Sequence, residues 1–264
     1  MRTMVTTVLL ASAIASAALC GDADFQWQGQ LASGQLLEIR GVNGSIHAEG
    51  TADHTASVTA HKTGNNNDPA GVSVQAVVFD GGVVVCALYP DSDSRPPNVC
   101  GAPHMDTYLS ANNNDVQVEF TVKVPQGVLF SARTINGDIQ ATAMTAHADA
   151  GTLMGNIMIT TTRSAQASTL HGSIGAIIGT TLWNGVQALD AGFGNIDLQI
   201  PSDANVDVHA MAFRGAIVSD FPLDITMEGN STMARGTLGS GGRSLKLSTF
   251  SGNITLHQGP ASSQ

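Results

Sequence analysis

Charged residues are scarce in this sequence, at 12% of its 264 residues, whereas they make up about 25% of a typical soluble domain. Acidic residues outnumber basic ones by 21 to 11, which gives a formal net charge of −10. No cluster of Lys or Arg occurs along the chain, so the sequence would repel a phosphate backbone, and nucleic acid is excluded as a predicted partner. The 29 glycines, with many Ser, Thr and Asn, are typical of strands and turns rather than helices.

Long hydrophobic runs are also missing, with one exception at the N-terminus. Arg2 precedes the apolar stretch MVTTVLLASAIASAAL, residues 4–19. This arrangement predicts a signal peptide over residues 1–20 and export to the periplasm, the cell surface or the medium. The run is too short and too rich in Ala and Ser to predict a membrane span, and no later segment approaches one. Cleavage after Ala18 or Cys20 fits the small residues there; a lipid anchor on Cys20 is the alternative, but Leu19 is in the wrong place for the usual lipobox.

Cysteine is rare as well, with three residues in the chain. Cys86 and Cys100 enclose a proline-rich segment of an exported chain, which predicts a disulfide that ties this segment to the strand before it. Closing a loop of that length would stabilise the fold by about 3 kcal/mol. A metal pair or a catalytic thiol is the alternative, and no histidine pattern nearby supports either one.

A repeated phrase is what the sequence has in abundance, as in SARTINGDIQA (131–141), STLHGSIGA (168–176) and STFSGNITL (248–256). Its glycines recur every 16 to 22 residues, and the second residue after each one is apolar. The glycines of this series are Gly137, Gly155, Gly172, Gly194, Gly215 and Gly252, and the apolar residues after them are Ile139, Ile157, Ile174, Ile196, Ile217 and Ile254. Gly236 with Leu238 is a further copy, and Gly44 with Ile46 is an earlier, isolated one.

The repeating unit reads Thr-apolar-x-Gly-polar-apolar, and the alternation around it predicts strands with one buried face. We expect the glycine at a corner that requires a positive φ. An antiparallel meander also fits, because Asn-Gly between alternating strands is a strong hairpin signal. The spacing and the constant core offset favour a parallel solenoid, in which the isoleucines of successive coils stack in a ladder.

The predicted fold class is therefore all-β: a single-stranded parallel β-helix with an antiparallel or mixed section in its N-terminal part. Residues 21–264 form one solenoid domain in this interpretation. Longer strands and proline-bounded loops break the period between about residues 50 and 127, and we interpret this section as a cap for the stack. Residues 128–258 form the regular coils.

Several segments, taken in order, resemble the bacterial DUF4097 family, whose members are described as adhesins. The segments are FQWQGQLASGQLLEIRGVNGSIHAEG (25–50), VVVCALYP (83–90) followed by a second cysteine, VKVPQGVLFSARTINGDIQA (122–141), SDFPL (219–223) and GTLGSGGRSLKLSTFSGNITL (236–256). The resemblance covers nearly all of the chain after the signal peptide. It implies an exported single-stranded parallel β-helix without an established enzymatic activity, and it supplies no functional residues to carry over. The chain departs from the family pattern where Met154, His171, Phe193, Arg214 and Ser251 replace the Asn before the glycine.

Catalysis is the alternative to a binding, adhesion or scaffolding function, because parallel β-helices include polysaccharide lyases and hydrolases. Such sites gather carboxylates on one face of adjacent coils. The aspartates of the repeats stand at different offsets from their glycines, so they predict no paired acid and base; they are Asp138, Asp149, Asp190, Asp197 and Asp207. Three or more carboxylates converging in one groove beside a basic residue would favour the enzyme.

Other candidate sites lack a recognisable pattern. The eight histidines show no metal-binding spacing, and the two NNND segments, 65–68 and 112–115, lack the frame of a calcium loop. Trp27 and Trp183 are the main candidates for a carbohydrate-stacking platform, although aromatic residues make up only 5% of the chain. We therefore predict no catalytic residue, metal or cofactor. The predicted partner is an envelope component, a glycan or a protein, which the sequence does not identify further.

Overall fold

The computed structural model describes residues 25–91, 96–103 and 108–262 of the chain. In these residues the regular structure consists of strands apart from one turn of 3-10 helix, η1 (Pro69–Gly71). The predicted fold class, an all-β parallel solenoid with a mixed section, is confirmed. The predicted signal peptide and Cys20 lie outside the described residues. No described helix has the length and apolar character that a membrane crossing requires.

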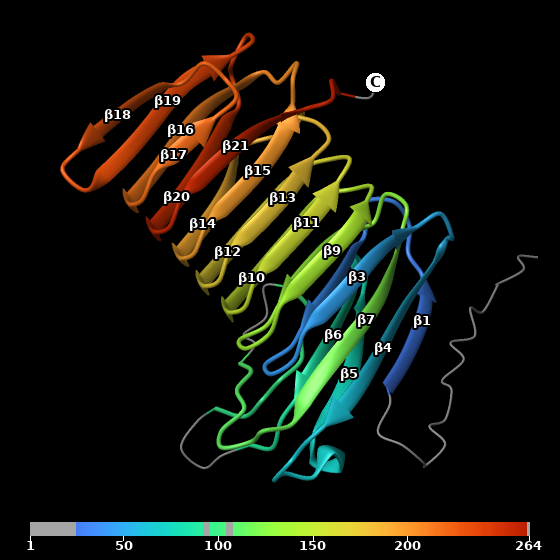
Figure 1. Cartoon of the computed structure of the whole chain (residues 1–264). Helices are drawn as coiled ribbons and strands as arrows, with labels where there is room; N and C mark the ends of the chain where they lie inside the picture. The colour runs from blue at the N-terminus through green and yellow to red at the C-terminus, as the bar shows by residue number, and fades with distance from the viewer. Residues whose placement is uncertain (1–24, 92–95, 104–107, 263–264) are drawn as a thin grey trace, which may run out of the picture.

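Two sheets face each other, and the chain passes from one to the other at the glycine corners (Figure 1). Sheet 1 contains the strands that follow these glycines, and sheet 2 contains the strands that precede them. The spatial order of sheet 1 is β1 (Phe25–Gln30), β4 (Thr55–Thr63), β7 (Gln117–Pro125), β3 (Ile46–Thr51), β9 (Ile139–Met144), β11 (Ile157–Thr161), β13 (Ile174–Ile178), β15 (Ile196–Pro201), β21 (Ile254–Gly259) and β17 (Ile217–Ser219). The spatial order of sheet 2 is β18 (Asp224–Glu228), β19 (Ser231–Leu238), β16 (Val206–Arg214), β20 (Ser244–Ser251), β14 (Val186–Phe193), β12 (Ala165–His171), β10 (Ala148–Met154), β8 (Leu129–Arg133), β2 (Leu36–Arg40), β6 (Gly82–Leu88) and β5 (Ser73–Phe79).

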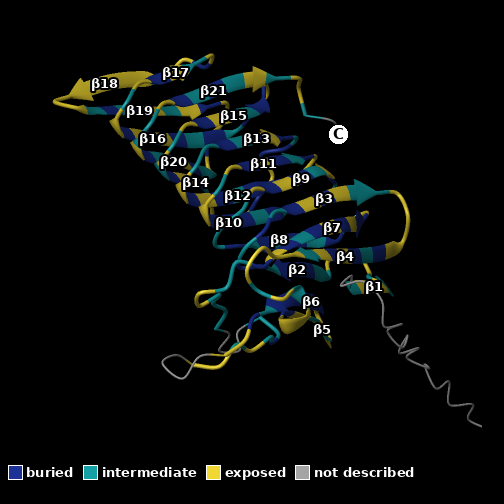
Figure 2. Ribbon diagram, turned by 60° about the horizontal axis from the view of Figure 1, so that its bottom comes forward, coloured by how far each residue is buried: buried dark blue, intermediate teal, exposed yellow. Residues whose placement is uncertain are grey.

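The isoleucines after the corner glycines form one continuous line through sheet 1. The register places them opposite one another in the spatial order Ile139, Ile157, Ile174, Ile196, Ile254, Ile217. All six are buried between the two sheets. Buried and exposed residues alternate along the strands (Figure 2), because successive side chains of a strand point to opposite faces of its sheet. A fully buried aliphatic side chain stabilises a fold by about 1.5 to 3 kcal/mol, so the line is a large part of the core.

The last coils do not stack in the order of the sequence. The coil of β20 and β21 lies between the coil of β14 and β15 and that of β16 and β17. The copy at Gly236 is not a corner at all, because β19 runs antiparallel to β16 and Leu238 lies opposite Val206. The antiparallel strands β19 and β18 instead form the end of sheet 2, and β18 is its edge strand. Spacing along the chain cannot distinguish a further coil from such a returning hairpin.

The corner glycines stack closely on one another. A Cβ on Gly155 would overlap the carbonyl oxygen of Gly137, and the same overlap with the neighbouring coil occurs at the other five glycines of the series. Most of these glycines have a positive φ, but Gly215 does not, and a Cβ there would still overlap the carbonyl oxygen of Gly252. Close approach of the backbones therefore requires glycine even where the predicted positive φ is absent.

The polar positions of the repeat also make hydrogen bonds between coils. The threonine three residues before the glycine donates its hydroxyl to the corner glycine carbonyl of the adjacent coil. These pairs are Thr134 to Gly44 (3.2 Å), Thr152 to Gly137 (3.1 Å), Thr169 to Gly155 (3.0 Å) and Thr249 to Gly194 (2.9 Å). Thr232 of the antiparallel strand β19 makes the same bond to Gly215 at 2.8 Å. The residue after the glycine accepts from the next coil's amide, as when Asn195 accepts from the N–H of Asn253 at 2.8 Å.

The section between the first coil and β8 forms the mixed part of the fold. Strands β6 and β7 continue the two sheets parallel to β2 and β3, and β5, β4 and β1 add antiparallel strands outside them. The coil of Gly44 is therefore not isolated, because β2 and β3 pair directly with β8 and β9. The section between β3 and β8 therefore separates, along the sequence, two coils that are neighbours in the stack.

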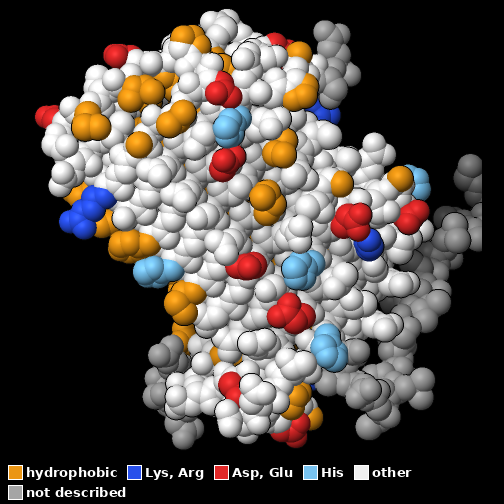
Figure 3. Space-filling model, in the orientation of Figure 1, with side chains coloured by type: hydrophobic (Ala, Val, Ile, Leu, Met, Phe, Trp, Pro, Cys, Tyr) orange, Lys and Arg blue, Asp and Glu red, His pale blue; other side chains and the backbone are white. Residues whose placement is uncertain are grey.

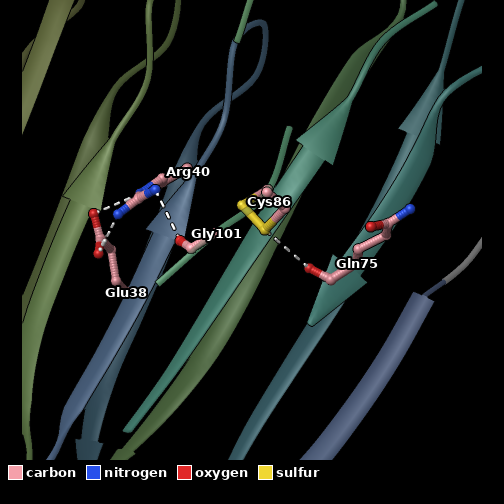
Figure 4. Close-up of a disulfide and its surroundings, with 6 residues drawn as sticks. Glu38, Arg40, Gln75, Cys86 and Gly101 are labelled. Carbon is pink, nitrogen blue, oxygen red and sulfur yellow. Dashed lines mark hydrogen bonds and ion pairs between the residues drawn. A yellow bond between two sulfur atoms is a disulfide. The ribbon is translucent and has the colours of Figure 1, made fainter. Parts of the chain in front are cut away.

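A disulfide and an arginine hold the segment after β6 against sheet 2 (Figure 4). Cys86 and Cys100 are bonded, with their Cα atoms 5.7 Å apart. Arg40 pairs with Glu38 at 2.7 Å and donates to the carbonyl oxygen of Gly101 at 3.1 Å. The predicted disulfide is thus present, and the ion pair beside it provides a second attachment for the same segment.

Candidate binding edge

The corner of the solenoid exposes apolar side chains in coil after coil. Because the chain turns at each glycine, the two residues before it both point outward, as Leu153 and Met154 do at the end of β10. We call the resulting row the apolar edge, and it consists of Leu153, Met154, Leu170, His171, Phe193, Phe213, Arg214 and Phe250. Its apolar members are each between 42% and 53% exposed. Figure 3 shows hydrophobic side chains, with His and basic groups between them, along the left margin of the stacked coils.

The aromatic rings of the apolar edge contact one another from coil to coil. His171 and Phe193 stack with ring centroids 4.9 Å apart, and Phe213 and Phe250 stack at 5.0 Å. Phe193 and Phe250 join the two pairs edge to face at 5.6 Å. The Arg214 guanidinium lies 5.5 Å from the centre of the Phe250 ring. These contacts order the rings into a ridge that is already assembled before any partner arrives.

The sequence analysis did not predict this edge, because it assigned no face to the apolar residue two positions before the glycine. The signal was nevertheless there: Leu153-Met154 breaks the alternation of the strand, and two consecutive apolar residues cannot both face the interior. The two tryptophans named as candidates lie elsewhere. Trp183 is buried, and Trp27 packs partly buried against the core.

Within the residues that the structure describes, the carboxylates do not gather in the way that the enzyme alternative requires. On the outer face of sheet 1, His257 lies 3.5 Å from Asp197 and 3.3 Å from Asp220. The N–H of Gln258, followed by the His257 ring, lowers the pKa of Asp220. A hollow on sheet 2 is lined by two further carboxylates, Asp207 and Asp224. Each place therefore holds two carboxylates rather than the three that would favour catalysis.

The two NNND segments are oxygen-rich loops, which makes them a possible place for a metal ion. The structure brings these segments together, and Asp115 accepts hydrogen bonds from the backbone N–H groups of Asn66 and Asn67, both at 2.9 Å. The carboxylate oxygens thus serve to join the two loops. In the part of the chain that the structure describes, no group of three or more His, Cys, Asp or Glu side chains is arranged to hold a metal ion.

Comparison with known proteins places the chain beside three solved structures. No family model matches the sequence, so none supports the resemblance to DUF4097, and no curated protein matches it either. The chain is similar to a "putative cell adhesion protein" from Clostridium sporogenes ATCC 15579, with 13% identity, a TM-score of 0.46 and coverage of 89% of this chain and 100% of that one.

Two further solved structures are each described as a "putative adhesin". The structure from Bacteroides fragilis NCTC 9343 has 12% identity and a TM-score of 0.31 over 88% of this chain and 96% of that one. The structure from Parabacteroides distasonis ATCC 8503 has 10% identity and a TM-score of 0.24 over 89% and 97%. At TM-scores below 0.5 these likenesses carry no argument about function, which has to come from the surface of the chain itself.

Proposed function

We propose that the protein is an exported binding module of the adhesin type and that it attaches to a protein partner through the apolar edge, without a catalytic step. The observation that carries this proposal is the row of half-exposed Leu, Met and Phe side chains that continues across successive coils. Membership of DUF4097 belongs to the same proposal, on the ordered segments that resemble that family.

Exposure of this row is unfavourable unless something covers it. Monomeric proteins rarely expose large contiguous apolar patches, and those that do generally use them for interaction. The row also has the composition of an interface core, in which Phe, Met and Arg are enriched and Asp and Glu are depleted. The apolar edge contains no acidic residue, although acidic residues outnumber basic ones in the whole chain by 21 to 11.

A protein partner suits the edge better than a glycan. Sugars bind aromatic side chains through free ring faces, but the ring faces here lie partly against each other, as in the pairs His171–Phe193 and Phe213–Phe250. The ridge instead offers ring edges and aliphatic side chains that fit an apolar groove on another protein. Arg214 at the end of the ridge adds a donor group for the polar rim of such an interface.

Two features support a location outside the cytoplasm. The N-terminal segment has the pattern of a signal peptide. The bond between Cys86 and Cys100 is of a kind that persists in oxidising compartments. An adhesin-type function requires this location, so export forms part of the proposal.

The test is binding of fluorescently labelled mature protein, residues 21–264, to intact cells of the producing bacterium. We expect saturable binding that the double variant Phe213→Ser/Phe250→Ser weakens at least about tenfold, because truncating an interface anchor costs about 2 kcal/mol or more. The matched control is Met158→Ser/Val218→Ser, which removes two exposed apolar side chains from the outer face of sheet 1. Circular dichroism melting of all variants verifies that they fold.

Treatment of the cells identifies the partner class. Protease treatment should abolish binding, and periodate oxidation of surface glycans should leave it intact. The reverse result would replace the protein partner by a glycan. Equal binding of the edge variant and the wild type, or no saturable binding at all, would refute the proposed role of the edge. Sedimentation of the free protein tests whether the partner that covers the apolar edge is a second copy of the chain.

A further inference from the structure

Two basic side chains, Arg235 and Lys246, flank His209 in a row on the outer face of sheet 2. In the register of the sheet, His209 of β16 is opposite Arg235 of β19 on one side and Lys246 of β20 on the other. All three are exposed. Side chains opposite each other on neighbouring strands are about 5 Å apart at their Cβ atoms. The row therefore concentrates positive charge within three adjacent strands of an acidic protein.

On the other side of the row, Arg235 is opposite Asp224 of β18, whereas Lys246 is opposite Ala188 of β14. Most other basic side chains that the structure describes have partners: Arg40, Lys62, Lys123, Arg133 and Arg243 reach carboxylates or carbonyl groups, and Arg214 reaches Phe250. Neither the Arg235 nor the Lys246 side chain makes an ion pair or a hydrogen bond with any described residue. An anion outside the chain would therefore meet two charged donor groups that are not used in ion pairs within the fold.

The row runs through two hollows that share His209 and Arg235. One hollow has a volume of about 510 Å³ and includes Asp207, Asp224 and Thr237, and the other has a volume of about 190 Å³ and includes Met211, Met233 and Lys246. Asp207 is held in place by the Thr237 hydroxyl at 2.7 Å and the Gly242 N–H at 2.9 Å, and these bonds, in that order, lower its pKa. An ionised, oriented carboxylate therefore lies on one side of the cations, and two thioether side chains lie on the other.

We propose that these hollows bind an acidic sugar, a hexuronate or a similar carboxylate-bearing unit of a glycan. Arg235, Lys246 and His209 receive the sugar carboxylate, with the planar guanidinium of Arg235 suited to a two-point contact. Asp207 and Asp224 accept hydrogen bonds from the sugar hydroxyls. Met211 and Met233 pack against the C–H face of the ring, as flexible apolar side chains do in binding sites.

The acidic-sugar site is separate from the apolar edge and goes beyond the proposed protein partner. It uses outward positions further along the same strands: Met211 and Ser248 lie between the cationic row and the Phe213–Phe250 pair. Loss of either surface therefore leaves the side chains of the other in place. One protein could contact an acidic glycan and a neighbouring protein on one continuous face.

The test is titration of the folded mature protein with free sugars, followed by nitrogen-proton NMR spectra. The probes are galacturonate, glucuronate and N-acetylneuraminate, with galactose as the neutral counterpart and inorganic phosphate as the simple anion. We expect at least one acidic sugar to shift the amide signals of β16, β19 and β20, and galactose to bind at least about tenfold more weakly. The double variant Arg235→Gln/Lys246→Gln should also weaken binding of the acidic sugar about tenfold or more, since it removes both charged donors to the sugar carboxylate.

The matched control is Lys123→Gln/Arg163→Gln, which changes the net charge equally but lies away from the hollows. It should bind the acidic sugar like the wild type. Equal binding of galactose, or unchanged binding by the Arg235/Lys246 variant, would overturn the proposal. If phosphate bound as strongly as every acidic sugar, the site would be a general anion site, and the proposed recognition of a sugar would be wrong. Shifts outside the three strands, or none with any acidic sugar, would also contradict it. The Phe213→Ser/Phe250→Ser protein should retain sugar binding, so failure of this site and failure of the apolar edge are distinguishable.

Discussion

At the scale of single residues, the repeat is a set of contacts between coils rather than a chemical motif. Glycine is required because its neighbour's carbonyl oxygen occupies the space of a side chain. Threonine is required because its hydroxyl donates a hydrogen bond to that same glycine carbonyl. The side chain of the residue after the glycine accepts a hydrogen bond from a backbone N–H of the adjacent coil. Ala191 is an exception in this scheme: it lies in register with Thr169 and Thr249 but has no hydroxyl to offer.

The exception at Ala191 gives a prediction in both directions. Ala191→Thr should donate to the carbonyl of Gly172 as Thr169 does to Gly155, and raise the free energy of unfolding by about 1 kcal/mol. Thr169→Val keeps the shape but removes the donor, and should lower it by about 1 to 2 kcal/mol. Urea unfolding of both variants measures the difference. A destabilising Ala191→Thr would mean that the coil of β14 has no room for the hydroxyl.

At the scale of elements, the loops outside the coils depend on specific side-chain bonds. Asp115 joins the two Asn-rich loops, and Tyr89 donates to the carbonyl oxygen of Val116 at 2.7 Å. Burial raises the pKa of Tyr89 to about 12, so this hydroxyl keeps its proton. Hydrogen bonds from the N–H of Asn67, and then those of Asn66, lower the pKa of the Asp115 carboxyl. The stability of these loops therefore depends on pH through the Asp115 carboxyl.

The sign of this dependence follows from the lowered pKa. Because the folded protein favours ionised Asp115, its stabilising contribution is present above the carboxyl's ordinary pKa and is lost as the pH falls through the lower, folded value. We expect Asp115→Asn to be less stable than wild type at neutral pH, with the difference shrinking in strong acid. Hydrogen exchange of residues 64–68 and 112–116 across this pH range measures the effect. Asp80→Asn, in the turn between β5 and β6, is the control, and a constant difference at all pH values would contradict the assignment.

At the scale of the whole molecule, one core connects the coils and the mixed section. The line of isoleucines continues beyond Ile139 to Ile46 and then to Phe120 of β7, so the excursion of residues 50–127 shares the same interior. Both ends of each sheet carry strands that pair on one side only, and three of the four end strands, β1, β5 and β18, are antiparallel to their neighbours.

A charged side chain in the buried line of isoleucines should therefore unfold the entire stack of coils. Ile157→Asp buries an unpaired carboxylate between Ile139 and Ile174, and we expect loss of the cooperative thermal transition. The neighbouring Met158→Asp places the same charge on the outer face, where Met158 is 46% exposed, and should melt close to wild type. Calorimetry of the pair checks this. A normal transition for Ile157→Asp would remove the ladder as the basis of stability.

Much of the regular fold could be predicted from the sequence because its signal is local. The isoleucine column and the corner glycines are set by a short phrase, and the pairing of Cys86 with Cys100 is indicated by a short separation in a chain with a predicted signal peptide. The apolar edge could have been predicted in part, from consecutive apolar residues such as Leu153-Met154. The acidic-sugar site could not, because Arg235, His209 and Lys246 come from strands whose adjacency no spacing indicates.

By itself the sequence determined that the chain winds in coils with branched aliphatic residues inside, because alternation and glycine spacing act within each repeat. Only the tertiary structure decided which coil lies next to which: that β20 and β21 enter between earlier strands, that the Gly44 coil lies beside the Gly137 coil, and that β19 returns antiparallel. The physical reason is that backbone hydrogen bonds between strands are the same for any neighbour. The choice of neighbour depends on the sheet edges that remain open and on the side chains that fill the core between them.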